Sequence, residues 1–172
     1  MLFGCACYFF EISDKMMGGA SSAAIRLADD GAEGTPGSLA VSGNIEKKFP
    51  MPWAGVAYFP GALETSIANL SRWDAISFWV KGDCENGALM AMLKNQKMPG
   101  MKPFAITKQW QKITISFKDL GSSDGKNIMA FVFGVANTPG KFNIQIDDLR
   151  WSRKRNRDIY LILSAFMSCP PP

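Results

Sequence analysis

Short runs in which apolar and polar residues alternate make up most of the chain between residues 23 and 151, and Gly, Pro, Asn and Asp separate them. Alternation of this kind is typical of half-buried β-strands. The pattern predicts strands over residues 23–27, 38–45, 54–59, 75–81, 88–94, 104–107, 112–117, 128–136 and 141–147. We therefore expect an all-β fold, a sandwich or a barrel, with almost no helix.

Two of these strands indicate which face is buried, because successive side chains in a strand point to opposite faces of the sheet. In residues 75–81 and 141–147 one face is entirely apolar and the other largely polar. The inward-facing set is Ile76, Phe78, Val80, Phe142, Ile144 and Ile146. We also expect Trp110 in the core, because it opens the strand that carries Ile113, Ile115 and Phe117.

Histidine is absent from all 172 residues, and this excludes the commonest general base. It also excludes Ser/His/Asp and Cys/His nucleophiles and zinc sites with histidine ligands. One Ser-x-x-Lys match, Ser123 to Lys126, lies in a turn-like Ser-Ser-Asp-Gly-Lys segment and is treated as chance. Asp14, Asp74, Asp83, Asp119 and Asp124 also occupy turn-like positions, so a carboxylate-pair hydrolase is not expected.

The net charge of +4 comes from the end of the chain, because residues 1–149 carry equal numbers of cationic and anionic side chains. Arg150, Arg153, Lys154, Arg155 and Arg157 are opposed there only by Asp158. A neutral body offers no basic face for a phosphate backbone, so we expect no nucleic-acid partner.

Both termini and the four cysteines leave the compartment unassigned. Cys5, Cys7, Cys84 and Cys169 have no zinc-ligand spacing and permit three disulfide pairings. The opening Met-Leu-Phe-Gly-Cys resembles the end of a lipoprotein signal, but its apolar stretch is too short for one. Residues 159–167 are apolar but about half the length that spans a bilayer, so no transmembrane segment is expected.

Residues 13–22 read Ser-Asp-Lys-Met-Met-Gly-Gly-Ala-Ser-Ser, and four further blocks follow in a fixed order. These are Trp53-Ala54-Gly55, residues 76–83, residues 110–117, and the closing Phe142-x-Ile144-x-Ile146-Asp147-Asp148-Leu149. The series resembles the complex I intermediate-associated protein 30 domain of the bacterial type, whose opening motif has valine where Met16 stands. The resemblance covers residues 13–151. Residues 1–12 are therefore expected to be an N-terminal appendage, and residues 152–172 a basic and apolar C-terminal tail.

That resemblance implies a galactose-binding-type jelly-roll β-sandwich, a fold shared with many carbohydrate-binding modules. It implies no catalytic residues. Mitochondrial members of the family assist assembly of respiratory complex I, so the resemblance is compatible with either of two non-catalytic functions.

The first hypothesis is a carbohydrate-binding module. Aromatic rings stack on the C–H faces of sugars, and amides read their hydroxyl groups. The candidate ligand-binding residues are Trp53, Tyr58, Trp79, Asn95, Gln96 and Asn137. Trp79 in a groove among amides would favour this hypothesis.

The second hypothesis is a protein-interaction or assembly module, which needs an exposed apolar surface. Met90, Met92, Met98 and Met101 are the candidates for it, since methionine adapts to varied partners. A Trp79 on a flat apolar surface would favour this second reading.

No cofactor is expected, with one conditional metal site. If the first and last strands pair, Asp14 approaches Asp147 and Asp148, and a calcium ion would then neutralise these carboxylates. We favour the alternative, in which Asp14 accepts hydrogen bonds from the glycine-rich turn and Asp147 or Asp148 pairs with Lys15 or Arg150.

Overall fold

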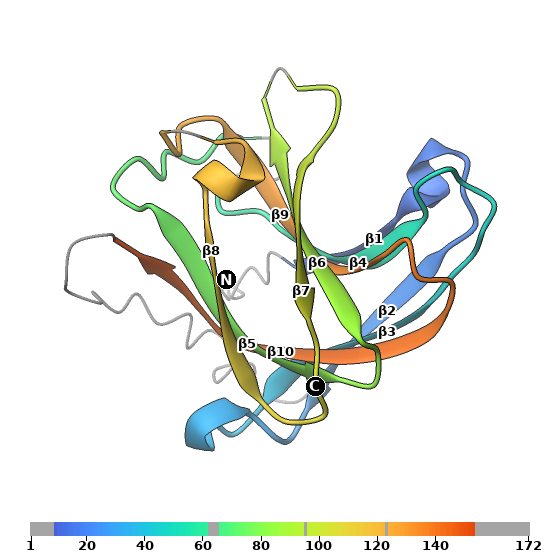
Figure 1. Ribbon diagram of the computed structural model, residues 1–172. Coiled ribbons are helices and arrows are strands. Elements are labelled where there is room, and N and C mark those ends of the chain that lie inside the picture. Colours follow the sequence, from blue (N-terminus) through green and yellow to red (C-terminus); the bar gives the residue numbers. More distant parts are fainter. Residues whose placement is uncertain (1–8, 62–65, 95, 123, 154–172) are drawn as a thin grey trace, which may run out of the picture.

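The computed structural model describes residues 9–61, 66–94, 96–122 and 124–153, and within them the chain forms two antiparallel sheets packed face to face (Figure 1). Short 3-10 helices η1 (Asp14–Met17), η2 (Ala32–Gly34) and η3 (Lys118–Leu120) are the helical elements of this part. The all-β sandwich expected from the alternation is confirmed.

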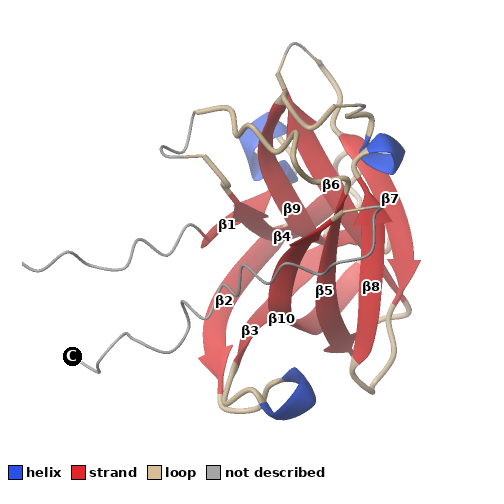
Figure 2. Cartoon of the chain, turned by 90° about the vertical axis from the view of Figure 1, so that its left-hand side faces the viewer, coloured by secondary structure: helices blue, strands red, loops and turns tan. Residues whose placement is uncertain are grey.

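Each sheet has five strands, and neighbours in space are mostly distant in sequence (Figure 2). The first sheet, in spatial order, contains β1 (Phe9–Ser13), β4 (Trp53–Tyr58), β9 (Ile128–Ala136), β6 (Asn86–Leu93) and β7 (Gly100–Ala105). The second contains β2 (Ser22–Ala28), β3 (Ser38–Ile45), β10 (Gly140–Ser152), β5 (Ala75–Gly82) and β8 (Gln111–Ser116).

Every strand expected from the sequence is present, and those at 38–45 and 128–136 have the expected bounds. The strand expected at 104–107 starts earlier in the structure, as β7 at Gly100–Ala105. Pro103 lies inside this strand, opposite Ala88 of β6. A proline is tolerated there because β7 is the edge strand of its sheet, where a missing N–H breaks no ladder.

Strand β1 was not expected, because residues 1–12 were assigned to an appendage. The structure pairs it with β4, from Phe9 opposite Tyr58 to Ser13 opposite Ala54. The Phe9 and Tyr58 rings lie 5.1 Å apart, and Glu11 Oε1 accepts a hydrogen bond from the Ile25 amide of β2 at 3.0 Å. Residues 9–12 therefore belong to the sandwich. Their pattern gave no signal, since β1 does not alternate cleanly between buried and exposed positions.

At the other end β10 continues to Ser152, and the Arg153 guanidinium lies 5.0 Å from the Trp73 ring centre. The remaining terminal residues, with Cys5, Cys7, Cys169 and the basic run after Arg153, lie outside the described residues. No helix in the described part of the chain is long and apolar enough to cross a membrane.

The core lies between the two sheets and contains the predicted inward-facing residues. Phe78 packs edge-on against Phe104 and Phe133, with ring centres 5.4 and 5.0 Å away. Ile76, Val80, Phe142, Ile144 and Ile146 are buried beside them. The expectation that Trp110 lies in the core is wrong. Trp110 precedes β8 instead of lying in it and is only half-buried, and the Lys81 ammonium lies 4.7 Å from the centre of its ring.

Candidate functional site

The segment that carries the opening motif folds into η1 and a tight return, and the Asp14 carboxylate is its anchor. Asp14 is fully buried and accepts hydrogen bonds from the Ser21 amide (2.9 Å), the Ser21 hydroxyl (2.7 Å) and the Trp53 amide (3.2 Å). The Ser21 hydroxyl in turn accepts from the Glu46 amide at 3.0 Å. One carboxylate thus joins the start of β2 to the start of β4.

Two glycines make this return possible, each for a different reason. Gly18 ends η1 with φ of 89°, in the left-handed region that favours glycine. Gly19 lies so close to Asp14 that an added Cβ would be 2.2 Å from the Asp14 Oδ1. The Met-Gly-Gly-x-Ser motif is therefore the sequence that lets a buried aspartate reach Ser21 and Trp53.

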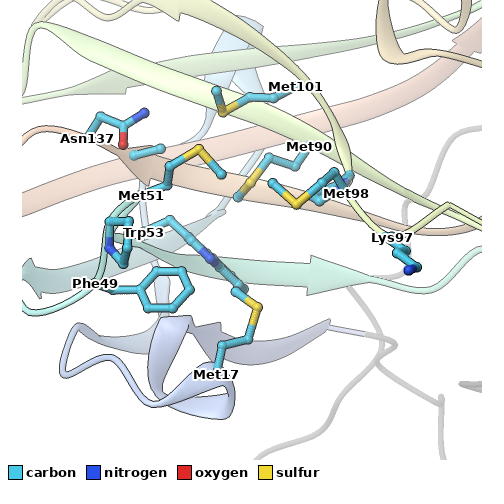
Figure 3. Close-up of a pocket in the computed structure, with 12 residues that line it drawn as sticks. Met17, Phe49, Met51, Trp53, Met90, Lys97, Met98, Met101 and Asn137 are labelled. Carbon is cyan, nitrogen blue, oxygen red and sulfur yellow. The ribbon is translucent and has the colours of Figure 1, made fainter.

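A pocket of about 300 Å³ opens on the outer face of the first sheet, beside η1 (Figure 3). Its floor belongs to an apolar cluster of Trp53, Ala57, Met90 and Val132 that lies outside the main core. The residues that line it come from five segments and are Met17, Phe49, Pro50, Met51, Trp53, Met90, Lys97, Met98, Pro99, Met101, Ala136 and Asn137. The lining is mainly apolar, and in Figure 3 its two polar side chains, Lys97 and Asn137, lie at opposite ends.

The strand pairing brings together two residues that the sequence nominated separately. Trp53 of β4 pairs with Ala136 of β9, and the Asn137 amide N–H donates to the Pro52 carbonyl at 2.8 Å. Asn137 has φ of 59°, a conformation that asparagine tolerates better than most residues. Trp53 itself is only 8% exposed, so it forms pocket floor and not an open platform.

Tyr58 points the other way from the same strand. Its ring is buried in the main core, 5.1 Å from Phe9 and 6.1 Å from Trp151 by ring centres. Tyr58 is therefore a core residue and does not line the apolar pocket.

Trp79 lies on the outer face of the second sheet, the side opposite the apolar pocket. Ile76, Phe78 and Val80 of β5 face the core, so alternation directs Trp79 outward, where it is half-buried between Lys112 of β8 and Asp147 of β10. The amides of Asn143 and Gln145 share this face of β10. A polar recess of about 240 Å³ adjoins them, lined by Lys81, Gly82, Asp83, Lys108, Asn143 and Gln145. Trp79 is thus on a polar face beside amides, though the recess does not include it.

An ion pair crosses this polar face. The Lys81 ammonium donates to Asp30 Oδ2, and this hydrogen bond, with the attraction between the two charges, lowers the pKa of the Asp30 carboxyl. Lys81 also lies over the Trp110 ring. The two contacts restrain the Lys81 ammonium, which belongs to a residue that lines the recess.

The other nominated residues do not join either surface. Gln96 is exposed in the turn after β6 and lines neither cavity, and Asn95 lies outside the described residues. The sequence reasoning also missed Asn143 and Gln145, although the polar face of residues 141–147 was the signal that contained them. Met17, Phe49 and Met51 carried no local signal for the pocket.

The calcium site that was expected if the first and last strands pair is not formed, because these two strands do not pair. Strand β2 pairs with β3, whereas β10 lies between β3 and β5. Asp147 Oδ2 accepts from the Ala32 amide at 2.8 Å and from the Thr35 hydroxyl, and Asp148 accepts from Arg150 Nε at 2.6 Å. Among the described residues no group of three or more Cys, Asp or Glu side chains is arranged to hold a metal ion.

Two of the other turn aspartates also serve the backbone. Asp83 Oδ1 accepts from the Asn143 amide at 2.8 Å, and Asp124 Oδ1 accepts from the Lys126 amide at 3.0 Å. These two carboxylates thus cap backbone amides, as the turn-like sequence around each of them predicts.

Cys84 is a free thiol within the described residues, and burial together with the neighbouring Asp83 charge raises its pKa to about 11. Because only the thiolate is nucleophilic, we expect alkylation of Cys84 at pH 8 to be about a hundredfold slower in the folded chain than in urea. Mass spectrometry of the Cys84 peptide after timed iodoacetamide treatment measures this. The rate should rise about tenfold per pH unit up to pH 10, and equal rates in the folded and unfolded chain would contradict the expectation.

No family model matches the chain, and no curated protein matches it in sequence. Solved structures do match in fold. The family 11 carbohydrate-binding module from Clostridium thermocellum, solved with a β-1,3-1,4-mixed-linked tetrasaccharide, superimposes with a TM-score of 0.64 at 18% identity, over 88% of this chain and 92% of that one. A family 30 carbohydrate-binding module gives 0.54 at 12% identity, over 80% and 78%. An exo-β-agarase gives 0.59 at 11% identity, over 89% of this chain and 24% of that enzyme. The chain therefore has the jelly-roll β-sandwich fold found in carbohydrate-binding modules.

Proposed function

We propose that the chain is a non-catalytic binding module of the carbohydrate-binding type, with its sugar site on the outer face of the second sheet. The observation that carries the proposal is the setting of Trp79: a half-buried indole on a polar sheet face that also presents the Asn143 and Gln145 amides. An indole stacks on the apolar face of a pyranose, while amides and ammonium groups bind its hydroxyls. The fold shared with carbohydrate-binding modules supports the proposal.

The charged groups of this face favour polar ligands. Lys81 and Lys108 line the recess together with the Asp83 carboxylate, and Lys112 flanks Trp79 in the next strand. A hydroxyl-rich chain can donate to the carboxylate and accept from the ammonium groups, so both signs of charge are used.

A second function, docking of a partner protein, is favoured by one specific observation. The apolar pocket on the first sheet gathers methionines, and it includes three of the four that the sequence nominated: Met90, which is buried, and Met98 and Met101, which are exposed. Met92, the fourth, packs against the same apolar cluster.

Trp79→Ala tests the sugar site. We expect the full chain to bind at least one polysaccharide of a panel in affinity gel electrophoresis, and the Trp79→Ala variant to bind it at least tenfold more weakly, as loss of a central aromatic contact predicts. Gln145→Ala should weaken it less, because it removes one hydrogen-bond donor and acceptor. Met98→Ser, in the other surface, is the matched control and should bind normally.

No glycoside in the panel should be hydrolysed above background, because the sequence has no histidine and the turn aspartates Asp83 and Asp124 accept hydrogen bonds from backbone amides. Polysaccharide binding that survives Trp79→Ala, or failure of every polysaccharide to bind the correctly folded chain, would refute this assignment.

A further inference from the structure

Several of the methionines that line the apolar pocket on the first sheet are exposed, and they form its rim. Of the large apolar side chains that are exposed within the described part of the chain, four line this single pocket. They are Met17, Met51, Met98 and Met101, with exposed fractions of 52, 45, 58 and 41%. Exposed apolar side chains gathered in one place, and not scattered, mark an interaction site.

The pocket combines this adaptable rim with a fixed floor. Trp53 and Met90 at the floor are 8 and 4% exposed, and the Trp53 amide is held by the buried Asp14 carboxylate. Met17 projects from η1, the element that Asp14 opens. Methionine has three rotatable bonds and a polarisable thioether, so rim side chains of this kind fit apolar groups of differing shape. The floor would define where the group sits and the rim would close around it.

The side chains around the pocket carry positive charge, which favours apolar partners that are acidic over those that are basic. Lys97 lines the pocket, and Lys47 and Lys48 immediately precede its Phe49-Pro50-Met51 segment. Residues 47–53 and 94–104, which supply most of the lining, contain no Asp or Glu. The one carboxylate of η1, Asp14, is buried and hydrogen-bonded, whereas Lys15 beside it is exposed. An apolar group that carries carboxylates next to it is therefore complementary to this surface, and a basic one is repelled.

We infer that this pocket docks a short segment of a partner protein that presents a bulky apolar side chain flanked by acidic residues. The inference goes beyond the sugar-binding function and is independent of it, because the pocket and Trp79 lie on opposite sheets. Aromatic and aliphatic anchors from one partner entering a fixed apolar floor, with complementary charge at the edge, are the usual arrangement of a small protein interface.

The test uses the full chain and synthetic 12-residue peptides on a glass support. One set alternates Leu, Phe or Met with Asp or Glu, a second replaces the acids by Lys, and a third replaces the apolar residues by Ser. We expect only the first set to bind. Fluorescence anisotropy of its best member should then show at least a tenfold loss of affinity in the double variant Met98→Ser, Met101→Ser, whose sites are exposed and tolerate the change.

Matched variants separate this docking from general stickiness. Met16→Ser removes an exposed methionine that adjoins Met17 in η1 but does not line the pocket, and it should leave the affinity unchanged. Lys97→Glu should weaken the acidic peptide several-fold, while Lys118→Glu, an exposed lysine on η3, should not. Trp79→Ala should have no effect on peptide binding, which keeps failure of this inference distinct from failure of the sugar site.

Three outcomes would overturn the inference. One is equal binding of the acidic and basic peptide sets, or of the double variant and the unaltered chain. The second is concentration-dependent dimerisation in sedimentation that the double variant abolishes, because the occupant would then be a second copy. The third is binding of vesicles of phosphatidylglycerol, but of no peptide, that is lost in the double variant, because the surface would then be one for anionic lipid.

Discussion

Replacing Asp14 by alanine is expected to reduce the free energy of unfolding by about 4 kcal/mol. The substitution leaves the buried amides of Ser21 and Trp53, and one bond of the Ser21 hydroxyl, without their acceptor. Each buried group left unpaired in this way costs roughly 1–3 kcal/mol. Urea denaturation followed by tryptophan fluorescence measures the loss as a lower midpoint with an unchanged slope.

Two companion variants identify the cause. Asp14→Asn keeps one acceptor oxygen but places an amide NH₂ against backbone donors, so its cost should be about half as large. Asp29→Ala, at an exposed position just after β2, should change stability by less than about 0.5 kcal/mol. If Asp14→Ala unfolds at the same urea concentration as Asp29→Ala, the hydrogen-bond network does not hold the two strands together.

The alternation along the chain was sufficient for nine of the ten described strands because their buried faces are nearly continuous, whereas β1, which does not alternate cleanly, was missed. Phe78 and Ile144 lie at positions that only the inward face of a strand explains, and both are fully buried or nearly so. The same rule could have separated the aromatic candidates. Trp53 and Tyr58 are five residues apart in one strand, so their side chains point to opposite faces, and only one of them can meet a ligand on the outside.

Which residues meet across strands was beyond the local pattern. Trp53 meets Asn137 because β4 pairs with β9, and Trp79 is separated from both because β5 belongs to the other sheet. Strand order depends on pairing between segments far apart in sequence, and alternation carries no information about the partner. The pocket likewise depends on η1 lying beside β4. The opening motif was recognised, but its role in carrying Met17 to a pocket required the buried Asp14 contacts to be seen.

Comparison of two shortened chains should show that residues 9–12 are part of the folded sandwich. A chain that begins at Phe9 keeps every contact described for β1, whereas one that begins at Ser13 loses the pairing with β4. The chain that begins at Ser13 also loses the Phe9–Tyr58 ring contact and the Glu11 carboxylate that accepts from the Ile25 amide. Backbone pairing, one aromatic pair and one charge-assisted hydrogen bond together predict a stability loss on the order of 4 kcal/mol.

Loss of β1 would also make β4 an edge strand, and its six residues are all buried in the intact sheet. Unpaired edges of apolar strands associate with one another, so the chain that begins at Ser13 should melt earlier and should show aggregates in size-exclusion chromatography.

Two point variants in the chain that begins at Phe9 test how much single side chains of β1 contribute to its stability. Glu11→Ala should lose no more than about 1 kcal/mol, because its hydrogen bond with the Ile25 amide is exposed and water can replace the carboxylate. Phe10→Ser should lose a similar amount, because Phe10 is 40% exposed but contacts the Phe59 ring. Equal urea midpoints for the two shortened chains would place the start of the folded domain at residue 13, and β1 would then contribute nothing to its stability.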